Sequence, residues 1–425
     1  QMSRTYHSIY KDYLMKSKYK NELRPIVINN WEATYFDFNE EKIKEIAREA
    51  SKLGIEMFVL DDGWFGKRNM DNSSLGDWFV NEAKLPNGLK GVADAVNSYG
   101  MKFGLWVEPE MISPDSDLYR AHPDWCIHVP NRSRSQSRQQ LILDYSRADV
   151  REAIIEMLTN VFESANIEYV KWDMNRNMSE IGSALLDASR QQETAHRYML
   201  GLYEVLETIT DRFPNILFES CSGGGGRFDP GMLYFMPQNW TSDNTDGVER
   251  LKIQHGTSIV YPNCAMTAHV SAVPNHQTGR ETSLSFRHAV AMAGNFGYEL
   301  DVTKMTEEEK DYIKEQVKLY KSIRPIVQYG DLYRLKSPFE GNHTSLLYVS
   351  KDKKEAVVFL YRVMNEPNCP LYKFRLDGLN PDFKYRLDNS ELVISGQQLM
   401  GYGINEPNEM RWGDFKGAVI RLSAV

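Results

Sequence analysis

The residues best suited to chemistry lie in one short stretch around Asp173, where charge abruptly follows apolar residues. Tyr169 and Val170 are aromatic or β-branched, as is typical of a buried strand. A lysine, an aspartate, an asparagine and an arginine then follow within six residues, around a tryptophan. Catalytic groups of parallel barrels sit where buried strands end. This position makes Asp173 a candidate nucleophile, and a structural ion pair with Lys171 or Arg176 is the alternative.

Polar and aromatic residues recur at the carboxyl end of successive predicted strands. Scattered surface charge would not keep this phase with the strands. Because the carboxyl ends of parallel barrel strands meet on one face, we expect these side chains to share a pocket. The set is Trp31, Asp61, Asp62, Trp106, Lys171, Asp173, Cys221 with the glycines that follow it, and Asp243.

The spacing of these residues disfavours several common kinds of site. The set contains no His-x-His pair, which disfavours a metal-dependent hydrolase. The glycines at 223–226 are not followed by the Lys-Ser/Thr of a nucleotide-binding loop, and the Gly-x-Ser-x-Gly of a serine hydrolase is missing. The remaining pattern, carboxylates between aromatic walls, suits glycoside hydrolysis, in which one carboxylate is nucleophile or base and another is acid. We therefore expect no metal and no cofactor.

The elements that must position these residues alternate between strand and helix over about 300 residues. Such alternation predicts an α/β fold with a (β/α)8 TIM barrel at 23–327. Strand candidates exceed the eight places of a barrel by one, and 141–144 is expected to be a short extra strand. Residues 1–22 are predicted to be a lead-in segment with a short helix. Short strands and turns at 328–425 predict a small antiparallel β-sandwich domain.

Composition narrows the class of protein further. The 425 residues exceed one ordinary core, so two or more domains are expected. The net charge of -8 argues against binding to nucleic acid or to an anionic membrane. A cytoplasmic location is expected because the N-terminus has no signal-peptide pattern and the cysteines form no C-x-x-C pair. The cysteines are Cys126, Cys221, Cys264 and Cys369.

Six short motifs follow one another in order along the chain. They are Trp-Glu-Ala at 31–33, Leu-Asp-Asp-Gly-Trp-Phe at 60–65, Leu-Trp-Val-Glu-Pro-Glu at 105–110, Lys-Trp-Asp-Met-Asn-Arg at 171–176, Cys-Ser-Gly-Gly-Gly at 221–225 with Arg227, and Trp-Thr-Ser-Asp at 240–243. Together they resemble the bacterial α-galactosidases of glycoside hydrolase family 36. Any one motif is weak evidence, but six in register are highly specific. The helix and the β domain predicted after these motifs also fit the architecture of that family.

The resemblance implies retaining hydrolysis of terminal α-galactosides such as melibiose and raffinose. By position, Asp173 matches the nucleophile of the family and Asp243 matches its acid/base. Asp61 and Asp62 match the pair that binds the 4- and 6-hydroxyls of galactose. Galactose differs from glucose in its axial 4-hydroxyl, and a site built to pair a hydroxyl strongly rejects the isomer that misplaces it.

The other matches imply binding or supporting roles. Lys171 would hold ring hydroxyls, Trp31 and Trp106 would wall the pocket, and glycines after Cys221 would let the 2-hydroxyl approach the backbone. Glu108 and Glu110 are expected to be structural or supporting. The histidines at 269, 276 and 288 are expected to be satisfied polar residues. The predicted substrate-binding set is Trp31, Asp61, Asp62, Trp106, Arg138, Lys171, Asn175, Cys221, Gly223, Gly224 and Trp240.

Two departures from the family pattern bear on these expectations. The family usually carries a large N-terminal β-sandwich domain, which this sequence lacks, and Gln1 begins a polar, basic segment; we therefore expect part of a longer protein. The family often reads Gly-Arg-Asn-Gln where this chain has Ser-Arg-Gln-Gln at 137–140, which leaves a surface role for Arg138 as the alternative. The resemblance also implies a homo-oligomer, a tetramer. Galactosyl transfer, cleavage of α-N-acetylgalactosaminides and an inactive carbohydrate-binding fragment are the alternative functions.

Overall fold

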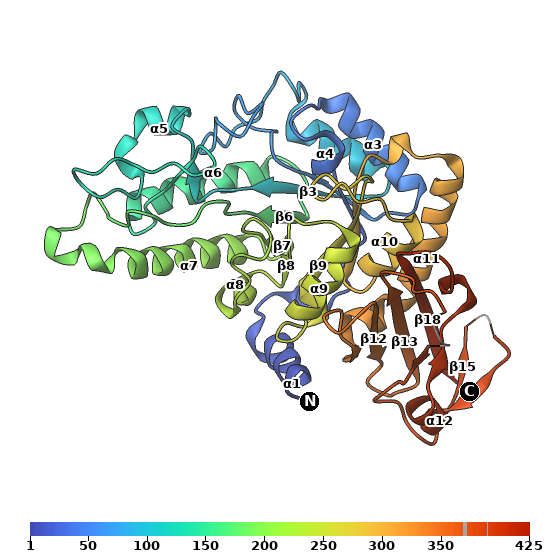
Figure 1. Cartoon of the computed structure of the whole chain (residues 1–425). Coiled ribbons are helices and arrows are strands. Elements are labelled where there is room, and N and C mark those ends of the chain that lie inside the picture. Colours follow the sequence, from blue (N-terminus) through green and yellow to red (C-terminus); the bar gives the residue numbers. More distant parts are fainter. Residues whose placement is uncertain (369–371, 389) are drawn as a thin grey trace.

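A closed barrel of eight parallel strands forms the larger part of the molecule (Figure 1). The structure, a computed structural model, describes residues 1–368, 372–388 and 390–425. Neighbouring strands are parallel and follow the order β1-β10-β9-β8-β7-β6-β3-β2, which confirms the predicted (β/α)8 barrel. The strands are β1 (Val27–Asn29), β2 (Met57–Leu60), β3 (Lys102–Val107), β6 (Tyr169–Trp172), β7 (Leu217–Ser220), β8 (Gln238–Trp240), β9 (Met266–Ser271) and β10 (Asn295–Glu299).

Helices connect the strands and cover the outside of the barrel (Figure 1). In α3, the Asn39 side chain accepts a hydrogen bond from the Lys42 backbone N–H, and apolar residues recur at helical spacing so that one face is buried. α11 begins with the predicted capping box of Thr306 and Glu309. The helices along the barrel are α2 (Trp31–Thr34), α3 (Glu40–Lys52), α4 (Gly88–Ser98), α5 (Asp117–Ala121), η3 (Pro123–Trp125), α6 (Ala148–Glu163), η4 (Ala188–Glu193), α7 (Thr194–Arg212), α8 (Pro230–Phe235), α9 (Gly247–Thr257), η5 (Asn263–Ala265), α10 (Leu284–Ala291), η6 (Val302–Lys304) and α11 (Glu307–Tyr329).

One strand outside the barrel and one strand inside it show that apolar residues alone do not identify the barrel strands. The expected extra strand at 141–144 is β5 (Leu141–Ile142), which pairs with β4 (Met111–Ile112) outside the barrel. β9 has polar residues at alternate positions, so its bounds do not stand out in the sequence. Inside the barrel, Thr267 donates a hydrogen bond to Glu219, and His269 Nδ1 lies 3.1 Å from Glu299 Oε2. Glu219 lies on β7, two strands away from β9, and Glu299 lies on the neighbouring strand β10. These two carboxylates allow Thr267 and His269 to be buried in β9.

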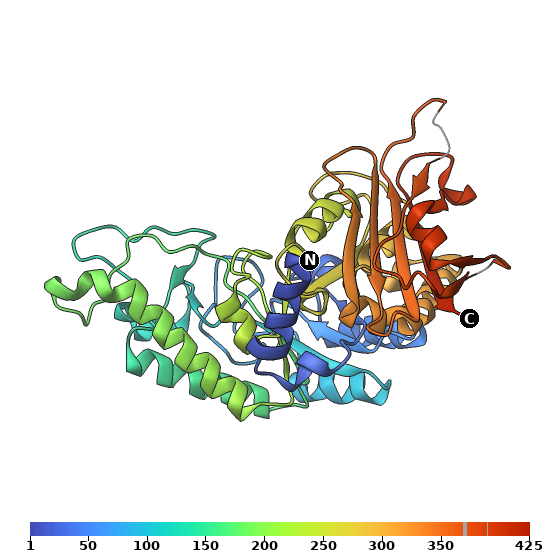
Figure 2. The ribbon, with the colours of Figure 1, turned by 90° about the horizontal axis from the view of Figure 1, so that it is seen from below.

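The N-terminal segment crosses one end of the barrel, as its blue ribbon in Figure 2 shows. It contains α1 (Met2–Ile9), a π-helical turn, η1 (Tyr10–Leu14), and η2 (Lys18–Asn21), which agrees with the predicted short helix. Met15 is buried with Leu233 and Cys264. The Tyr10 ring stacks on that of Tyr261, with centroids 5.7 Å apart. The segment is therefore packed against the barrel.

An antiparallel β domain follows α11 and confirms that part of the predicted architecture. Its six-stranded sheet has the order β11-β12-β13-β18-β15-β16, and β14-β17 with α12 forms a second layer. The elements are β11 (Asp331–Lys336), β12 (His343–Val349), β13 (Glu355–Arg362), β14 (Lys373–Phe374), β15 (Lys384–Leu387), β16 (Val393–Ser395), α12 (Gly396–Gly401), β17 (Ile404–Asn405), η7 (Asn408–Met410) and β18 (Lys416–Ala424).

The two faces of the six-stranded sheet have different partners. Tyr348 and Tyr361 belong to the barrel core, and their hydroxyls donate to Ala293 O at 3.0 Å and Ala289 O at 2.9 Å. The alternate residues, including Leu347 and Leu360, pack in a separate core with the second layer. Figure 2 accordingly shows the sheet standing against the barrel with its second layer outermost. The domain is thereby anchored to the barrel.

Two further features bear on the expectations from composition. Among the described residues, no helix combines the length and the apolar character needed to cross a membrane. Cys126, Cys221 and Cys264 are buried and free, whereas Cys369 lies outside the described residues.

Candidate active site

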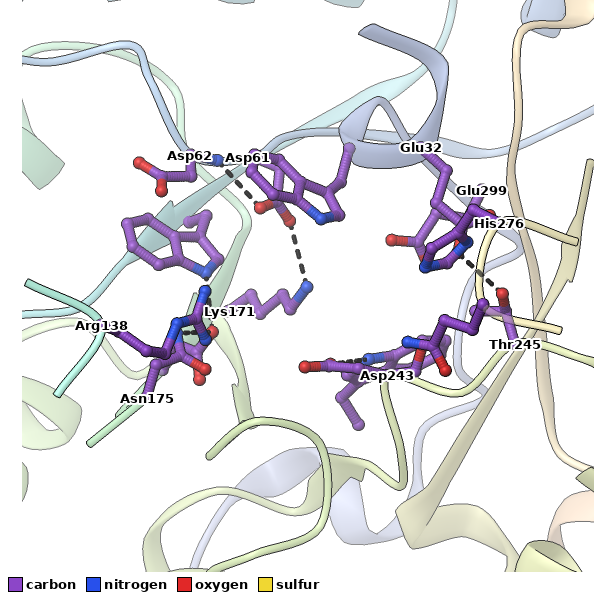
Figure 3. Close-up of a pocket in the computed structure, with 15 residues that line it drawn as sticks. Glu32, Asp61, Asp62, Arg138, Lys171, Asn175, Asp243, Thr245, His276 and Glu299 are labelled. Atoms are coloured by element: carbon purple, nitrogen blue, oxygen red, sulfur yellow. Dashed lines mark hydrogen bonds and ion pairs between the residues drawn. The ribbon is translucent and has the colours of Figure 1, made fainter. Parts of the chain in front are cut away.

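A cavity lies at the carboxyl end of the barrel strands (Figure 3). Its walls come from residues at or just after the ends of β1, β2, β3, β6, β8, β9 and β10, together with the loop that carries Arg138. All but three of the predicted catalytic and binding residues meet there, as strand phase predicts. The lining residues are Trp31, Glu32, Asp61, Asp62, Trp106, Arg138, Lys171, Asp173, Asn175, Trp240, Asp243, Thr245, His276, Gln277 and Glu299.

Asp173 is a buried carboxylate held by hydrogen bonds rather than by an ion pair. Its Oδ2 accepts from Trp106 Nε1 at 3.1 Å and from Asn175 Nδ2 at 2.8 Å. The Met174 backbone N–H donates to Oδ1 at 2.8 Å. Arg176, the suspected partner, instead donates to Ser135 and to other oxygens of its own loop. The ion-pair alternative with Arg176 is therefore wrong, and three hydrogen-bond donors hold the Asp173 carboxyl in place.

Asp243 lies in the loop after β8, in an environment that favours its neutral form. Burial and the negative charge of Asp173 raise the pKa of its carboxyl above the usual value, although Lys171 opposes the shift. Trp240 Nε1 donates to Asp243 Oδ1 at 2.9 Å, and Gln277 Nε2 donates to the Asp243 backbone O at 3.0 Å. A carboxyl with a raised pKa can carry a proton to a reacting atom at neutral pH. Two carboxyl groups with different environments thus face one cavity.

Asp61 and Lys171 form an ion pair on the wall of the cavity. Lys171 Nζ lies 3.1 Å from Asp61 Oδ2, which also accepts from Asn29 Nδ2 at 2.6 Å. Burial disfavours the charged form of Lys171, but the negative charge of Asp61 and weaker effects from neighbouring groups outweigh it and raise the lysine pKa well above its usual value. Lys171 therefore stays charged, and its partner is Asp61. The alternative in which Lys171 pairs with Asp173 is wrong.

Asp62 is held by an arginine that the sequence pattern does not reveal. Arg68 Nε lies 2.6 Å from Asp62 Oδ1, and Arg68 Nη2 lies 2.8 Å from Asp62 Oδ2. Both side chains are buried. This bidentate contact orients the Asp62 carboxylate at the edge of the cavity.

Aromatic side chains and Arg138 complete the predicted walls. The Trp31 ring meets those of Tyr35 and Phe36 edge-on, with centroids 5.2 and 5.1 Å away. Arg138 lines the cavity with 43% of its side chain exposed, and its Nη2 lies 3.9 Å from Asp71 Oδ1. It has a positive φ of 53°. Arg138 therefore belongs to the cavity but sits at its solvent-facing side.

Cys221, Gly223 and Gly224 do not line the cavity, which corrects their expected place on its floor. A Cβ at Gly224, where φ is +88°, would come within 2.5 Å of Ser242 Cα and 2.8 Å of Asp243 N. Cys221 is buried. Because Gly224 has no side chain, its loop can approach the backbone that carries Asp243. Close packing of two loops, rather than an open floor, is the physical reason for the difference.

Five lining residues were not predicted: Glu32, Thr245, His276, Gln277 and Glu299. Glu32 and Glu299 follow or end strands, the same signal that identified the other carboxylates. His276 was expected to be a satisfied polar residue, but it borders the cavity with 38% of its side chain exposed. Its Nδ1 lies 3.5 Å from Glu32 Oε1, so it has a polar partner at the edge of the cavity. His288 is satisfied, because its Nδ1 lies 2.8 Å from Leu284 O and its Nε2 lies 3.0 Å from Tyr298 OH.

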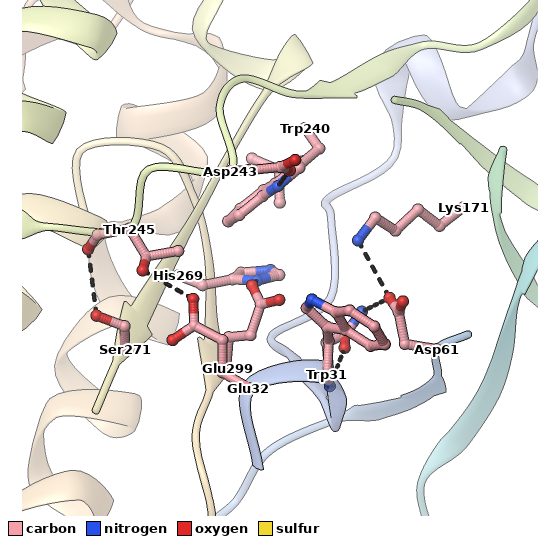
Figure 4. Close-up of polar contacts among 12 residues, drawn as sticks. Trp31, Glu32, Asp61, Lys171, Trp240, Asp243, Thr245, His269, Ser271 and Glu299 are labelled. Carbon is pink, nitrogen blue, oxygen red and sulfur yellow. Dashed lines mark hydrogen bonds and ion pairs between the residues drawn. The ribbon is translucent and has the colours of Figure 1, made fainter. Parts of the chain in front are cut away.

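Glu32 and Glu299 lie side by side on one wall (Figure 4). Burial, followed by the charge of Glu299, raises the pKa of Glu32 to about 8. Burial acts in the same direction on Glu299, but the His269 hydrogen bond and then Lys171 outweigh it and lower the pKa of Glu299. Of the two, Glu32 is therefore the carboxyl that favours the protonated form.

Glu108 and Glu110 stand behind the cavity wall, in line with their expected supporting role. Glu108 Oε1 accepts from Gln140 Nε2 at 2.9 Å and from the Asn175 backbone N–H. Burial, followed by the charge of Asp173, raises the pKa of Glu108 to about 8. Arg227 donates to both oxygens of Glu110 at 2.8 Å. Among the described residues, no group of three or more His, Cys, Asp or Glu side chains is arranged to hold a metal ion.

Comparison with protein families covers almost the whole chain. The Melibiase model matches residues 1–330, and the model of the glycosyl hydrolase family 36 C-terminal domain matches residues 343–422. The chain is 62% identical over 424 residues to alpha-galactosidase AgaA of Geobacillus stearothermophilus and 51% identical over 425 residues to alpha-galactosidase Mel36A of Lactobacillus acidophilus. Each alignment covers 100% of this chain and 58% of the relative. The chain thus spans less than two thirds of these relatives.

Solved structures agree with the sequence comparison. The crystal structure of the AgaA alpha-galactosidase from Geobacillus stearothermophilus superposes with a TM-score of 0.98 at 62% identity, over 100% of this chain and 58% of that one. An AgaA variant solved in complex with raffinose gives the same TM-score at 61% identity and the same coverage.

Proposed function

We propose that this chain, which belongs to the Melibiase family and to glycoside hydrolase family 36, is a retaining α-galactosidase. Its substrates would be galacto-oligosaccharides with a terminal α-D-galactose, such as melibiose and raffinose. The names of the relatives support this activity, and a complex of one relative with raffinose supports the substrate class. The observation that carries the proposal is the pair Asp173 and Asp243, two carboxyl groups with different environments on one cavity.

The proposed reaction proceeds in two steps. The Asp173 carboxylate forms a bond to the anomeric carbon of galactose, while Asp243 gives its proton to the glycosidic oxygen and the carbon–oxygen bond breaks. Asp243, now charged, then takes a proton from water, and the water oxygen displaces Asp173 from the anomeric carbon. Two inversions at that carbon retain its configuration.

The remaining predicted residues would hold the galactose ring. Asp61, Asp62 and Lys171 offer charged acceptors and a donor to ring hydroxyls, and charged partners make the stronger hydrogen bonds. Discrimination against glucose follows if the axial 4-hydroxyl pairs with this group. The proposed binding set comprises Trp31, Asp61, Asp62, Trp106, Arg138, Lys171, Asn175 and Trp240, with Cys221, Gly223 and Gly224 acting through the neighbouring loop.

Proton NMR of the reaction tests this function directly. The 425-residue chain is mixed with 4-nitrophenyl α-D-galactoside, and the first anomer of free galactose is recorded before mutarotation. Appearance of α-galactose first is the expected result. Appearance of β-galactose first would rule out the retaining mechanism, and hydrolysis by an Asp173→Asn control would rule out Asp173 as nucleophile. The same chain extended upstream shows whether residues outside it are needed for activity.

We further propose three features of organisation, of which the tetramer rests on the family resemblance. The chain divides into a lead-in at 1–22, a catalytic barrel at 23–327 and a β domain at 328–425. The protein acts in the cytoplasm and assembles as a homotetramer. Light scattering of the purified protein tests the tetramer, and a monomer at micromolar concentration would contradict it.

A further inference from the structure

A network of hydrogen bonds fixes the direction of one amide beside the acid/base. The Asn275 Oδ1 atom accepts from the backbone N–H groups of Gln277 at 3.0 Å and Thr278 at 3.1 Å. An oxygen that accepts two backbone N–H groups leaves the amide nitrogen at the other end. Asn275 Nδ2 therefore faces Thr245, and its nitrogen donates to Thr245 Oγ1 at 3.1 Å.

This amide in turn fixes the direction of the Thr245 hydroxyl. Thr245 Oγ1 accepts from Asn275, and its hydrogen points to Glu32 Oε1, 2.8 Å away. Glu32 Oε1 is therefore an acceptor, and when the carboxyl is neutral its proton resides on Oε2. Among the described residues, no N–H or hydroxyl group donates a hydrogen bond to Glu32 Oε2, whereas Thr245 and His276 both contact Oε1. A polar atom with a directed proton is thus left to the cavity that Glu32 lines.

Glu32 lies on the same side of the cavity as the acid/base (Figure 3). Thr245 follows Asp243 by two residues, and Gln277 donates to the Asp243 backbone. Asp62 and Arg138 line the opposite side in Figure 3. An acid/base must face the oxygen that joins galactose to its leaving group. The wall that carries Glu32 therefore borders the leaving group.

We propose that Glu32 is a specificity-determining residue whose neutral carboxyl donates a hydrogen bond from Oε2 to a hydroxyl of the sugar unit attached to galactose. The proposal rests on the proposed function, because it takes the side of Asp243 as the leaving-group side. His276 borders the same wall, with Nδ1 3.5 Å from Glu32 Oε1. This wall would favour sugar leaving groups over leaving groups without hydroxyls.

Burial and one neighbouring carboxylate together favour the neutral form of Glu32. Burial and then the charge of Glu299, from β10, raise its pKa to about 8. Cations oppose this shift, Arg250 from α9 more than Lys171 from β6, but they do not reverse it. The other titratable groups facing this region are Tyr35 beyond α2, Asp243 after β8, His269 on β9 and His276 on the following loop.

Binding measurements in an Asp173→Asn background test the proposal without any turnover. Melibiose carries the second sugar, whereas methyl α-D-galactoside presents the same galactose without it. In Glu32→Gln, the amide keeps an acceptor toward Thr245 and a donor in place of Oε2. Glu32→Leu keeps the approximate size and removes both. Calorimetry gives the ratio of the two dissociation constants for each protein.

We expect Glu32→Gln to keep the preference for melibiose and Glu32→Leu to lower it by about five- to tenfold. Thr245→Val, which frees the orientation of the carboxyl, should lower it by a smaller factor. A preference unchanged in Glu32→Leu, or lost equally in Glu32→Gln, would overturn the proposal. Equal weakening of both ligands would overturn it too, because Glu32 would then hold the galactose itself.

The outcome is separable from that of the proposed function. Loss of the melibiose preference without any galactoside hydrolysis by the chain with Asp173 intact would reject the hydrolase function and keep the role of Glu32 in sugar binding. Hydrolysis by the intact chain, together with an unchanged melibiose preference in the variants, would support the hydrolase function and reject the role of Glu32. A chain that binds neither sugar would contradict both. Thermal unfolding of each variant, with Glu32→Gln as the isosteric control, shows whether the fold is kept.

Discussion

Trp240 holds the carboxyl of Asp243 through one hydrogen bond, from Nε1 to Oδ1 at 2.9 Å. The ring of this tryptophan is itself clamped, because Arg250 Cζ lies 4.3 Å and the His269 centroid 4.6 Å from its own centroid. A hydrogen bond to the charged form of a carboxyl lowers its pKa, so Trp240 restrains the rise that burial and Asp173 produce in Asp243. One indole thus both places and tunes the proposed acid.

Trp240→Phe should move the alkaline limb of activity to higher pH. The ring remains, but the donor to charged Asp243 is lost, so the pKa of Asp243 rises further. Because Asp243 must be protonated to act as an acid, the fall in kcat/KM at high pH then begins later. The measurement is the pH profile of kcat/KM on melibiose, with Trp31→Phe as a control that removes no bond to Asp243. A limb that stays in place or moves to lower pH would contradict the assignment of Asp243.

Azide should distinguish the roles of the two aspartates. Asp243→Ala should still form the covalent intermediate from an activated aryl galactoside, whose leaving group needs no proton, while melibiose stops reacting. Azide then attacks the intermediate and yields a galactosyl azide of retained configuration. Asp173→Ala should not react with any substrate alone, and azide in place of the carboxylate should yield the inverted product. The configuration of each product is determined by NMR. An inverted azide from Asp243→Ala and a retained azide from Asp173→Ala would show that the two roles are reversed.

Gly224→Ala should lower kcat through the position of Asp243. The new Cβ would meet Ser242 Cα at 2.5 Å, so the loop that carries Asp243 has to move. A displacement of about 1 Å at a reacting group costs on the order of 100-fold in rate. Gly88→Ala is the matched control, since Gly88 also has a positive φ but no atom within 4 Å of its Cβ position. Equal effects of the two substitutions on kcat would show that backbone strain alone is responsible.

Removal of the Asp62 carboxylate should impair folding as well as sugar binding. Asp62→Ala leaves the buried Arg68 guanidinium without its bidentate partner, and breaking such a pair costs about 3–5 kcal/mol of the free energy of unfolding. Asp62→Ala/Arg68→Met should recover much of this stability, because the unpaired charge is gone, but not galactoside binding. Urea denaturation and KM are measured for both variants. Recovery of normal KM in the double variant would show that Asp62 does not touch the sugar.

The local pattern of this sequence determined the barrel and the main chemical groups. Strand and helix periodicity depend on neighbours along the chain, so alternation of the two predicted the (β/α)8 fold and the separate β domain. Asp61, Asp173 and Asp243 each follow the carboxyl end of a predicted strand. Because the carboxyl ends of parallel barrel strands lie on one face, this position predicted that the three residues line one cavity, as they do.

Only the tertiary structure decided which partner each group takes. Lys171 pairs with Asp61 across the barrel, and Arg68 with Asp62 from a loop, because strand register and loop path bring distant charges within 4 Å. The same registration brings Glu32 beside Glu299 and turns two similar carboxyl groups into one neutral and one charged group. Burial and neighbouring charge set this difference, and neither is encoded in the spacing of residues along the chain.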